Sequence, residues 1–126
     1  MKMIVALIRP HQLPFVKVAL HENGINHFTA TSAMGTAPAA KQQTFRGVER
    51  RSELHQRLRL EIAVSDEQVE LVIESIIDGS KNCGRHGVIF VQDVVDVIRV
   101  WNGARGDAIQ RADQVQPIMS DRAKGE

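Results

Sequence analysis

The residues best suited to chemistry gather in one polar stretch, from residue 35 to 56. This stretch shows neither a helical nor a strand period of hydrophobic residues, and a segment so long in a chain of 126 residues is commonly functional. Its arginines, with Arg57 and Arg59 just after it, suit either a solvated surface or an arm that pairs with acidic groups or a small anion. The residues that we assign to a partner-binding loop are Phe45, Arg46, Glu49, Arg50 and Arg51.

A second candidate is the turn Gly84-Arg85-His86-Gly87. Glycine lets backbone N–H groups approach an anion closely, and arginine offers a planar fork for phosphate oxygens. The same four residues also suit a plain turn. The motif alone therefore leaves both interpretations open.

Catalytic and metal sites are not indicated by the sequence. Cys83 is the only cysteine, and the five histidines show no metal-ligand spacing with cysteine or carboxylates. No nucleophile, base and orienting group stand at informative spacing. We therefore expect no enzyme, no metal site and no covalent cofactor, with slow nucleotide hydrolysis as the alternative.

Charge and aromatic content limit the partners. Sixteen basic and fifteen acidic residues give a net charge of +1, and the chain has four Phe, one Trp and no Tyr. Neither value favours nucleic-acid binding. The start lacks a signal-peptide pattern, and no apolar run approaches the roughly 20 residues that span a bilayer. We expect a cytoplasmic protein without direct membrane insertion.

Hydrophobic periodicity predicts the elements that must position these residues. One helix should begin near Leu13 and stop before Gly24, and a second should follow Ser65 and end at Asp78-Gly79. Alternating or continuous apolar runs predict the strands. These strands are 4–8, 27–33, 58–63 and 88–91, with a further short strand within 94–100.

This order of elements, βαββαβ, predicts an α+β, ferredoxin-like fold with both helices on one face of the sheet. We expect one domain over residues 1–109, because two halves would each bury too little core, and a polar, flexible tail over 110–126. The second face of the sheet also carries Ile, Val and Leu. It therefore predicts an oligomer.

Several segments together resemble the PII signal-transduction family. Lys2–Pro10, Arg59–Val64 and Asp93–Arg99 match it in order and spacing, and Thr44–Arg50 stands where the family's T-loop carries a Tyr-Arg-Gly-x-Glu-Tyr segment. The resemblance implies a homotrimer with a long T-loop between strands 2 and 3, here about 35–56. It also implies adenine-nucleotide binding in the clefts between subunits.

The resemblance carries over nucleotide-site residues one position at a time. Thr29, Gly35 and Val64 match residues around the base and the loop entrance, while Gly87 and Arg99 match residues near the phosphates. The predicted nucleotide site also includes nearby positions at which this chain differs from the family. Its members are Thr29, Gly35, Arg57, Val64, Arg85, Gly87, Val88, Arg99 and Trp101.

The departures from the family lower the positive charge of that site. The family turn Gly-Asp-Gly-Lys reads Arg85-His86-Gly87-Val88 here, and Trp101 replaces the second arginine of an Arg-x-Arg pair. Arg85 restores one charge, and Arg57 takes the place of a family lysine. A triphosphate should be held less tightly than in typical members, so ADP, AMP and ATP all stay candidates for the effector.

The loop departs from the family as well. Pro38 stands in the stretch whose glutamine helps hold a metal and 2-oxoglutarate in the family, and proline offers no side-chain oxygen. The sequence therefore disfavours 2-oxoglutarate and magnesium. Arg50 falls at the tyrosine that many bacterial members have uridylylated, so this control is excluded in a chain without tyrosine.

These observations predict a nitrogen-regulation-type sensor that binds an adenine nucleotide between subunits and controls a target protein through its T-loop. The target would be a membrane transporter or a metabolic enzyme. Two alternatives stay open. One is an interaction trimer that binds no ligand, and the other is a regulator linked to bicarbonate and carbon metabolism.

Overall fold

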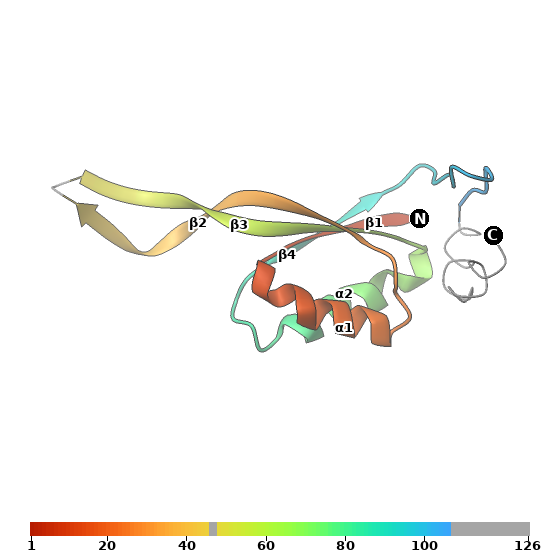
Figure 1. Cartoon of the computed structure of the whole chain (residues 1–126), viewed down its shortest axis with the longest axis horizontal. Helices are drawn as coiled ribbons and strands as arrows, with labels where there is room; N and C mark the ends of the chain where they lie inside the picture. Colours follow the sequence, from red (N-terminus) through yellow and green to blue (C-terminus); the bar gives the residue numbers. More distant parts are fainter. Residues whose placement is uncertain (46–47, 107–126) are drawn as a thin grey trace, which may run out of the picture.

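The computed structural model describes residues 1–45 and 48–106, and side chains are described outside 37–53. A four-stranded sheet carries two helices on one face (Figure 1). Arg46 and the predicted tail 110–126 lie outside the described residues. The elements in chain order are β1 (Lys2–Ile8), the 3-10 turn η1 (Pro10–Gln12), α1 (Leu13–Glu22), β2 (Thr29–Phe45), β3 (Val48–Val64), the 3-10 turn η2 (Asp66–Gln68), α2 (Val69–Ser80) and β4 (Val88–Asp93).

The sheet confirms the ferredoxin-like order. Its strands lie in the order β2-β3-β1-β4 and all neighbours are antiparallel. Ile4 lies opposite both Ile62 on β3 and Val91 on β4, so the two central strands bury the same face. The predicted strand within 94–100 is wrong: apart from an isolated bridge between Ile98 and Arg105, no pairing occurs there.

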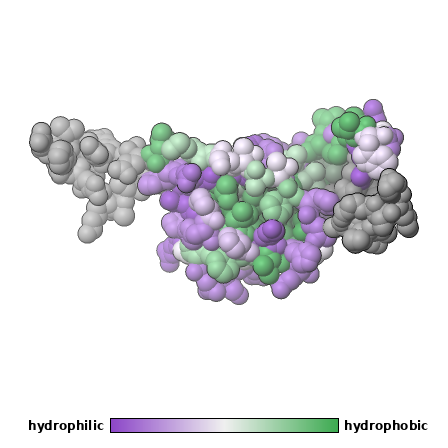
Figure 2. Space-filling model, in the orientation of Figure 1, coloured by the Kyte–Doolittle hydropathy of each residue, from purple (hydrophilic) through white to green (hydrophobic). Residues whose placement is uncertain are grey.

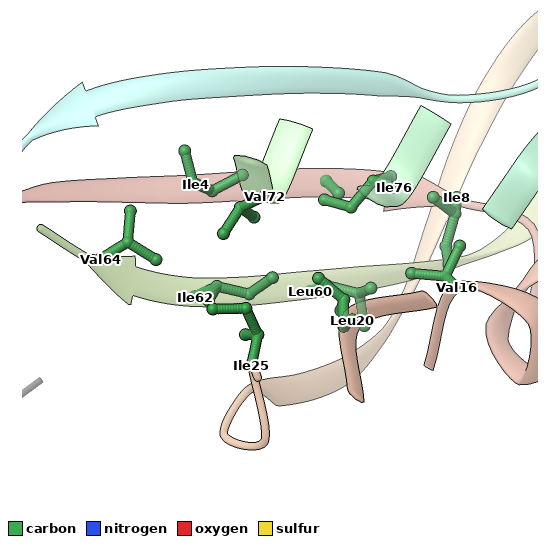
Figure 3. Packing of buried hydrophobic residues seen from close by; sticks show 11 residues of the cluster. Ile4, Ile8, Val16, Leu20, Ile25, Leu60, Ile62, Val64, Val72 and Ile76 are labelled. Atoms are coloured by element: carbon green, nitrogen blue, oxygen red, sulfur yellow. The ribbon is translucent and has the colours of Figure 1, made fainter. Parts of the chain in front are cut away.

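The core fills the space between the sheet and the helices (Figure 3). Alternate residues of β1 and β3 face the helices, as the strand period requires. On the helix side, Val72 and Ile76, which the 3.6-residue period selects on α2, are buried, whereas Ile77 of the same pattern is exposed. The fully buried members include Ile4, Leu60, Ile62, Val64, Val16, Leu20 and Val72.

Helix α2 runs one residue past its predicted end, through Gly79 to Ser80. A Cβ atom on Gly79 would lie 2.9 Å from both the Phe15 carbonyl oxygen and the Val16 Cα atom of α1. Glycine therefore serves here as the contact that lets two helix backbones approach closely. It does not end the helix.

The largest correction concerns residues 35–56, which we expected as an irregular loop. Leu58 of β3 pairs with Ile8, the last residue of β1. From this pair outward, only β2 and β3 continue, as a two-stranded ladder. Pairing runs from Ala33–Arg57 to Phe45–Val48, with an irregularity between Pro38 and Gln43. We call this part, residues 33–45 and 48–57, the ribbon; it projects away from the body (Figure 1). Backbone pairing needs no apolar alternation, because hydrogen bonds between strands form whatever the side chains are.

The sheet face opposite the helices is only partly covered in a single chain. Val5 lies opposite Phe90 and Leu7 lies opposite Val88 on this side, and we call these four residues the open face. Val5 is buried and Leu7 is partly buried, whereas the two β4 residues are not. Phe90 is 48% exposed and Val88 47% exposed. Apolar side chains also gather over the segment after β4, at the upper right of Figure 2, where Val95, Val100 and Trp101 are exposed. This distribution is typical of a chain that buries more surface by association.

Candidate effector site

A small pocket lies where the ribbon leaves the body. Three parts of the chain form it: the end of β1, the first residues of the ribbon on β3, and the turn before β4. Its volume is about 170 Å³. The residues that line it are Ile8, Arg9, Arg57, Arg85, His86 and Gly87. We call it the arginine pocket.

A buried glutamine holds two walls of this pocket together. Gln12 is fully buried. Its side-chain oxygen accepts a hydrogen bond from the Arg9 backbone N–H at 2.6 Å, and its side-chain nitrogen donates to the His86 carbonyl at 3.3 Å. A buried amide with both ends satisfied fixes the distance between the groups that it joins. Gln12 therefore positions the end of β1 against the turn before β4.

Two further contacts fix the turn itself. The His11 ring nitrogen Nε2 lies 3.1 Å from the Cys83 carbonyl oxygen, and the rings of His11 and His86 meet edge to face at 5.9 Å. Gly87 has φ +111°, and a Cβ atom there would lie 3.2 Å from the Leu7 carbonyl oxygen. A residue with a side chain would be strained at this position, so the turn can press against β1 only with glycine there.

The pocket is positively charged. Among the described residues, three arginines and one histidine line it, and no carboxylate does. Among the described residues, Arg57 is one of two whose side chain has a buried polar atom without a hydrogen-bond partner, its Nη1. An unpaired buried donor is costly, and an anion would satisfy it. Glu61, a carboxylate on the same strand, is already paired with Arg59 at 3.1 Å.

Arg57 also belongs to the root of the ribbon. It pairs with Ala33 across the ladder. Its Cγ and Nε atoms lie 3.6 Å from the place where a Cβ atom on Gly35 would be. Arg57 belongs to β3, and its side chain also lies beside Gly35 of β2. A ligand bound to Arg57 can therefore affect both strands of the ribbon.

The predicted site residues fall into separate places. Arg57, Arg85 and Gly87 come together in the arginine pocket, and Val88 follows directly as the first residue of β4. The predicted nucleotide site left out Arg9 and His86, although His86 belongs to the candidate turn. Arg9 directly follows the first predicted strand, and strand ends that meet at one edge of a sheet are the signal that could have identified it.

Arg99 and Trp101 lie apart from that pocket within one chain. The Arg99 guanidinium carbon is 5.6 Å from the centre of the Trp101 ring, a cation–π geometry. Both follow Asp93, which pairs with Lys2 at the start of β1, whereas the arginine pocket lies beyond its end. The two groups stand at opposite ends of the sheet.

Thr29, Gly35 and Val64 lie outside the arginine pocket. Thr29, the first residue of β2, pairs with Glu61 near the end of β3, and Gly35 lies in the ribbon opposite His55. Val64 is 0% exposed and packs in the core, so only its main chain is available to a ligand. These positions stay predictions as nucleotide contacts.

The predicted partner-binding residues lie at the far end of the ribbon. Phe45 ends β2 opposite Val48, and Glu49 and Arg50 pair with Thr44 and Gln43. Arg51 follows on β3. Their backbone forms the tip of a paired arm, so a partner would meet them far from the helices (Figure 1).

A larger depression, about 530 Å³, borders α1 and the segment after it. Pro14, Val18, Ile25 and Phe28 give it mainly apolar walls. Its charged groups do not converge on one point. Among the described residues no cluster of His, Cys, Asp and Glu could hold a metal ion. Within the same part of the chain, no helix is long and apolar enough to cross a membrane.

Comparison with known proteins identifies the family. The family model for nitrogen regulatory protein P-II matches residues 1–104. This chain belongs to the P-II family. The chain is 38% identical over 112 residues to nitrogen regulatory protein GlnK2 of Haloferax mediterranei, covering 86% of this chain and 90% of that protein. It is also 38% identical over 113 residues to nitrogen regulatory protein P-II of Rhizobium meliloti, covering 86% and 100%.

A solved structure agrees. The crystal structure of Arabidopsis thaliana PII bound to citrate superimposes with a TM-score of 0.68 at 32% identity, covering 85% of this chain and 86% of that one. The family assignment and the ferredoxin-like fold are confirmed. As a P-II protein, the chain is a signalling regulator that senses a small effector.

Proposed function

We propose that this chain is a cytoplasmic, homotrimeric regulator that binds an adenine nucleotide between subunits and controls a target protein through its ribbon. No catalytic step is required, because the differential affinity of the effector for two ribbon states supplies the switching free energy. The target would be a membrane transporter or a metabolic enzyme.

The observation that carries this proposal is the position of the arginine pocket at the root of the ribbon. Arg57 lines the pocket and is at the same time a ladder residue of the ribbon. An anion that satisfies its buried Nη1 atom would restrain the side chain and hence the strand that bears it. Effector binding and the arm that contacts the target thus share one residue.

The separation of the predicted residues supports a site between subunits. Arg99 and Trp101 lie at one end of the sheet and the arginine pocket at the other, so one chain cannot bring both groups to one nucleotide. A neighbouring copy that packs on the open face can supply the second group. Exposed Phe90 and Val88 give that copy an apolar surface to bury.

Calorimetric titration of the purified protein with ATP, ADP and AMP tests the proposal. We expect binding without release of phosphate, and ADP or AMP bound about as tightly as ATP, since Val88 and Trp101 offer the γ-phosphate no cation. Phosphate release would favour an enzyme, and no binding at all would favour an interaction trimer. A strong preference for ATP that 2-oxoglutarate and magnesium tighten would contradict our interpretation of the turn and the loop.

The second candidate, a regulator linked to carbon metabolism, shares the same pocket. Its three arginines, Arg9, Arg57 and Arg85, suit bicarbonate as well as phosphate. Adding bicarbonate to the nucleotide titration distinguishes the two candidates. Tightened nucleotide binding would favour the carbon-linked regulator.

A further inference from the structure

The depression beside α1 lies apart from the arginine pocket and shares no residue with it. Its volume is about 530 Å³, within the range of roughly 300–1,000 Å³ that is typical of ligand pockets. Val18, which is 56% exposed, and Phe28, which is partly buried, form two of its apolar walls, and the buried Ile25 adds a third. We call it the α1 depression. Its apolar walls favour an apolar occupant.

The rim of the α1 depression carries one charge of each sign. Lys17 and Glu22 lie there, both at exposed positions of α1. His21 Nδ1 lies 2.7 Å from the Asn26 side-chain oxygen, and this contact joins the end of α1 to the segment that follows it. A small ion of either sign would meet a like charge on this rim, so a small ion is not favoured. A peptide with apolar side chains and one charge of each sign suits it better.

The chain itself contains a segment of this composition. Residues 107–126 lie outside the described residues, and three large apolar side chains stand close together in their sequence: Val115, Ile118 and Met119. Charged residues flank these three. We call the whole stretch, 113–122, the tail segment.

The charges of the tail segment complement those of the rim. The segment ends in Asp121-Arg122, one charge of each sign. Lys17 and Glu22 offer the opposite charges beside the apolar walls. Exposed ion pairs of this kind add little affinity, but they select one orientation of the bound segment.

The tail begins at the same end of the molecule as the end of α1. The Gly106 N–H donates to the Val97 carbonyl at 3.0 Å, and the Val94 N–H donates to the Met1 carbonyl at 3.2 Å. Gly106, where the described chain ends, therefore lies close to the start of β1. Helix α1 also ends on this side, on the right in Figure 1.

The tail is long enough to reach the α1 depression. From Gly106 to Ile118 the chain can span up to about 40 Å. A sheet of four strands is only about 15 Å across, and a helix is about 10 Å thick. A tether of this length gives an effective concentration on the order of millimolar, so even a weak contact would be well populated within one chain.

We propose that the α1 depression is the docking site of the tail segment of the same chain. The side chains of Val115, Ile118 and Met119 contact its apolar walls, and the charges of Asp121 and Arg122 meet those of the rim. This inference goes beyond the proposed function and does not depend on it, because neither the depression nor the tail segment contains a predicted effector or partner-binding residue.

Disulfide trapping in the full chain tests the proposal. Val18→Cys and Ile118→Cys are combined in a Cys83→Ser background, which leaves no other thiol. In a glutathione redox buffer we expect a disulfide between positions 18 and 118 of one chain. Mass spectrometry of the unreduced protein measures its yield.

Glu70→Cys combined with Ile118→Cys is the matched control. Glu70 is exposed in the first turn of α2, and it is nearer to Ile118 along the chain than Val18 is. A tail segment that does not dock would therefore join position 70 at least as readily. We expect a yield about tenfold higher at position 18, because docking raises the effective concentration only there. Equal yields at the two positions would overturn the proposal, and so would a disulfide that joins two chains.

A second pair of variants tests the apolar contact. Met119→Asp, added to the pair at positions 18 and 118, brings a carboxylate against the apolar walls and should lower the disulfide yield severalfold. Ala123→Asp, beyond the tail segment, is its control and should leave the yield unchanged. Neither substitution alters a residue of the described core. Equal yields in these two variants would overturn the proposal, because the apolar side chains would then not enter the depression.

Discussion

Single residues set the charge of the candidate site. Arg57 joins the pocket to the ribbon, and Arg9 and Arg85 add positive charge around it. Arg99 stands at the far end of the sheet beside Trp101. Single substitutions can therefore test the two groups of arginines one at a time.

Arg99→Ala should weaken nucleotide binding roughly tenfold or more, because charge-assisted contacts to phosphate are worth about 1.5–3 kcal/mol. The fold should persist, since Arg99 lies outside the core. Calorimetry with ADP measures the effect, and Lys17→Ala, which removes an exposed positive charge on α1, is the control whose affinity should not change. Unchanged ADP binding would remove Arg99 from the site.

The ion pair between Lys2 and Asp93 predicts a pH dependence. Its hydrogen bond and charge attraction lower the pKa of Asp93 below its ordinary 3.8 and raise the pKa of Lys2 above its ordinary 10.5. The pair therefore stabilises the fold between these values. Its contribution is lost as the pH falls through the folded pKa of Asp93 or rises through that of Lys2.

Asp93→Asn should thus lower the free energy of unfolding slightly at neutral pH, by an amount that is lost as the pH falls through the folded pKa of Asp93. The Asp93 side chain is 84% exposed and that of Lys2 is 32% exposed, so solvent screening keeps the effect small. Urea unfolding between pH 2 and 7 measures it. Asp78→Asn, an exposed acid on α2, is the control and should show no such convergence with the wild type.

At the scale of elements, α1 and α2 pack closely because Gly79 of α2 has no side chain at their contact. Gly79 lies inside α2, where alanine would normally be the better helix former by about 1 kcal/mol. The backbone of α1 lies 2.9 Å from where that methyl group would be. Overpacking of this kind typically costs about 1–3 kcal/mol, so the steric cost exceeds the gain in propensity.

Gly79→Ala should therefore lower the melting temperature by several degrees at fixed protein concentration. The neighbouring Ser80→Ala is the control. The Ser80 hydroxyl is buried without a hydrogen-bond partner among the described residues, so its removal should leave stability unchanged or raise it. A stabilised Gly79→Ala variant would show that the two helices can move apart without cost.

The ribbon is the element most easily removed. Thr36 and Leu54 are direct partners in the ladder, so residues 37–53 can be replaced with Asn-Gly, the residues that a two-residue hairpin turn prefers. The body should keep its fold and assembly, because the described core contains none of the residues removed. Capture of the target protein should be abolished, as a pull-down compared with the full chain would measure. Recovery of the same partner by the shortened chain would place the contact surface elsewhere.

At the scale of the whole molecule, the open face is an apolar surface that a single chain leaves partly exposed. Helices cover one side of the sheet (Figure 1). On the other side, Phe90 and Val88 are nearly half exposed. An apolar face of this kind is stable in water when another copy covers it. The assembly and the effector site are therefore coupled in our proposal.

Phe90→Asp should dissociate the trimer, because it places a carboxylate in the apolar contact without a partner. Light scattering after size-exclusion chromatography measures the mass in solution. Val18→Asp is the matched control, since Val18 is 56% exposed on α1, away from the open face, and its substitution should leave the mass unchanged. A trimeric Phe90→Asp variant would show that the copies associate through another surface.

Much of this architecture can be predicted from local patterns. Val72 and Ile76 of α2 and the alternating Leu60 and Ile62 of β3 are buried as their periods require, because these periods follow from the geometry of single elements. The order βαββαβ and the membership of Arg57, Arg85 and Gly87 in one pocket also follow from the sequence and its resemblance. No tertiary contact was needed for these predictions.

Other features depend on contacts between residues far apart in the chain. The ladder of the ribbon has no apolar alternation, so only the pairing itself reveals it. Arg9 joins Arg57 and Arg85 because β1, β3 and the turn before β4 end at the same edge of the sheet. Gln12 is of a residue type that is mostly exposed in proteins, yet two backbone partners brought to it by the fold make its burial favourable. Local patterns carry no information on such long-range satisfaction of polar groups, and for this reason the assembled pocket could be recognised only in the folded chain.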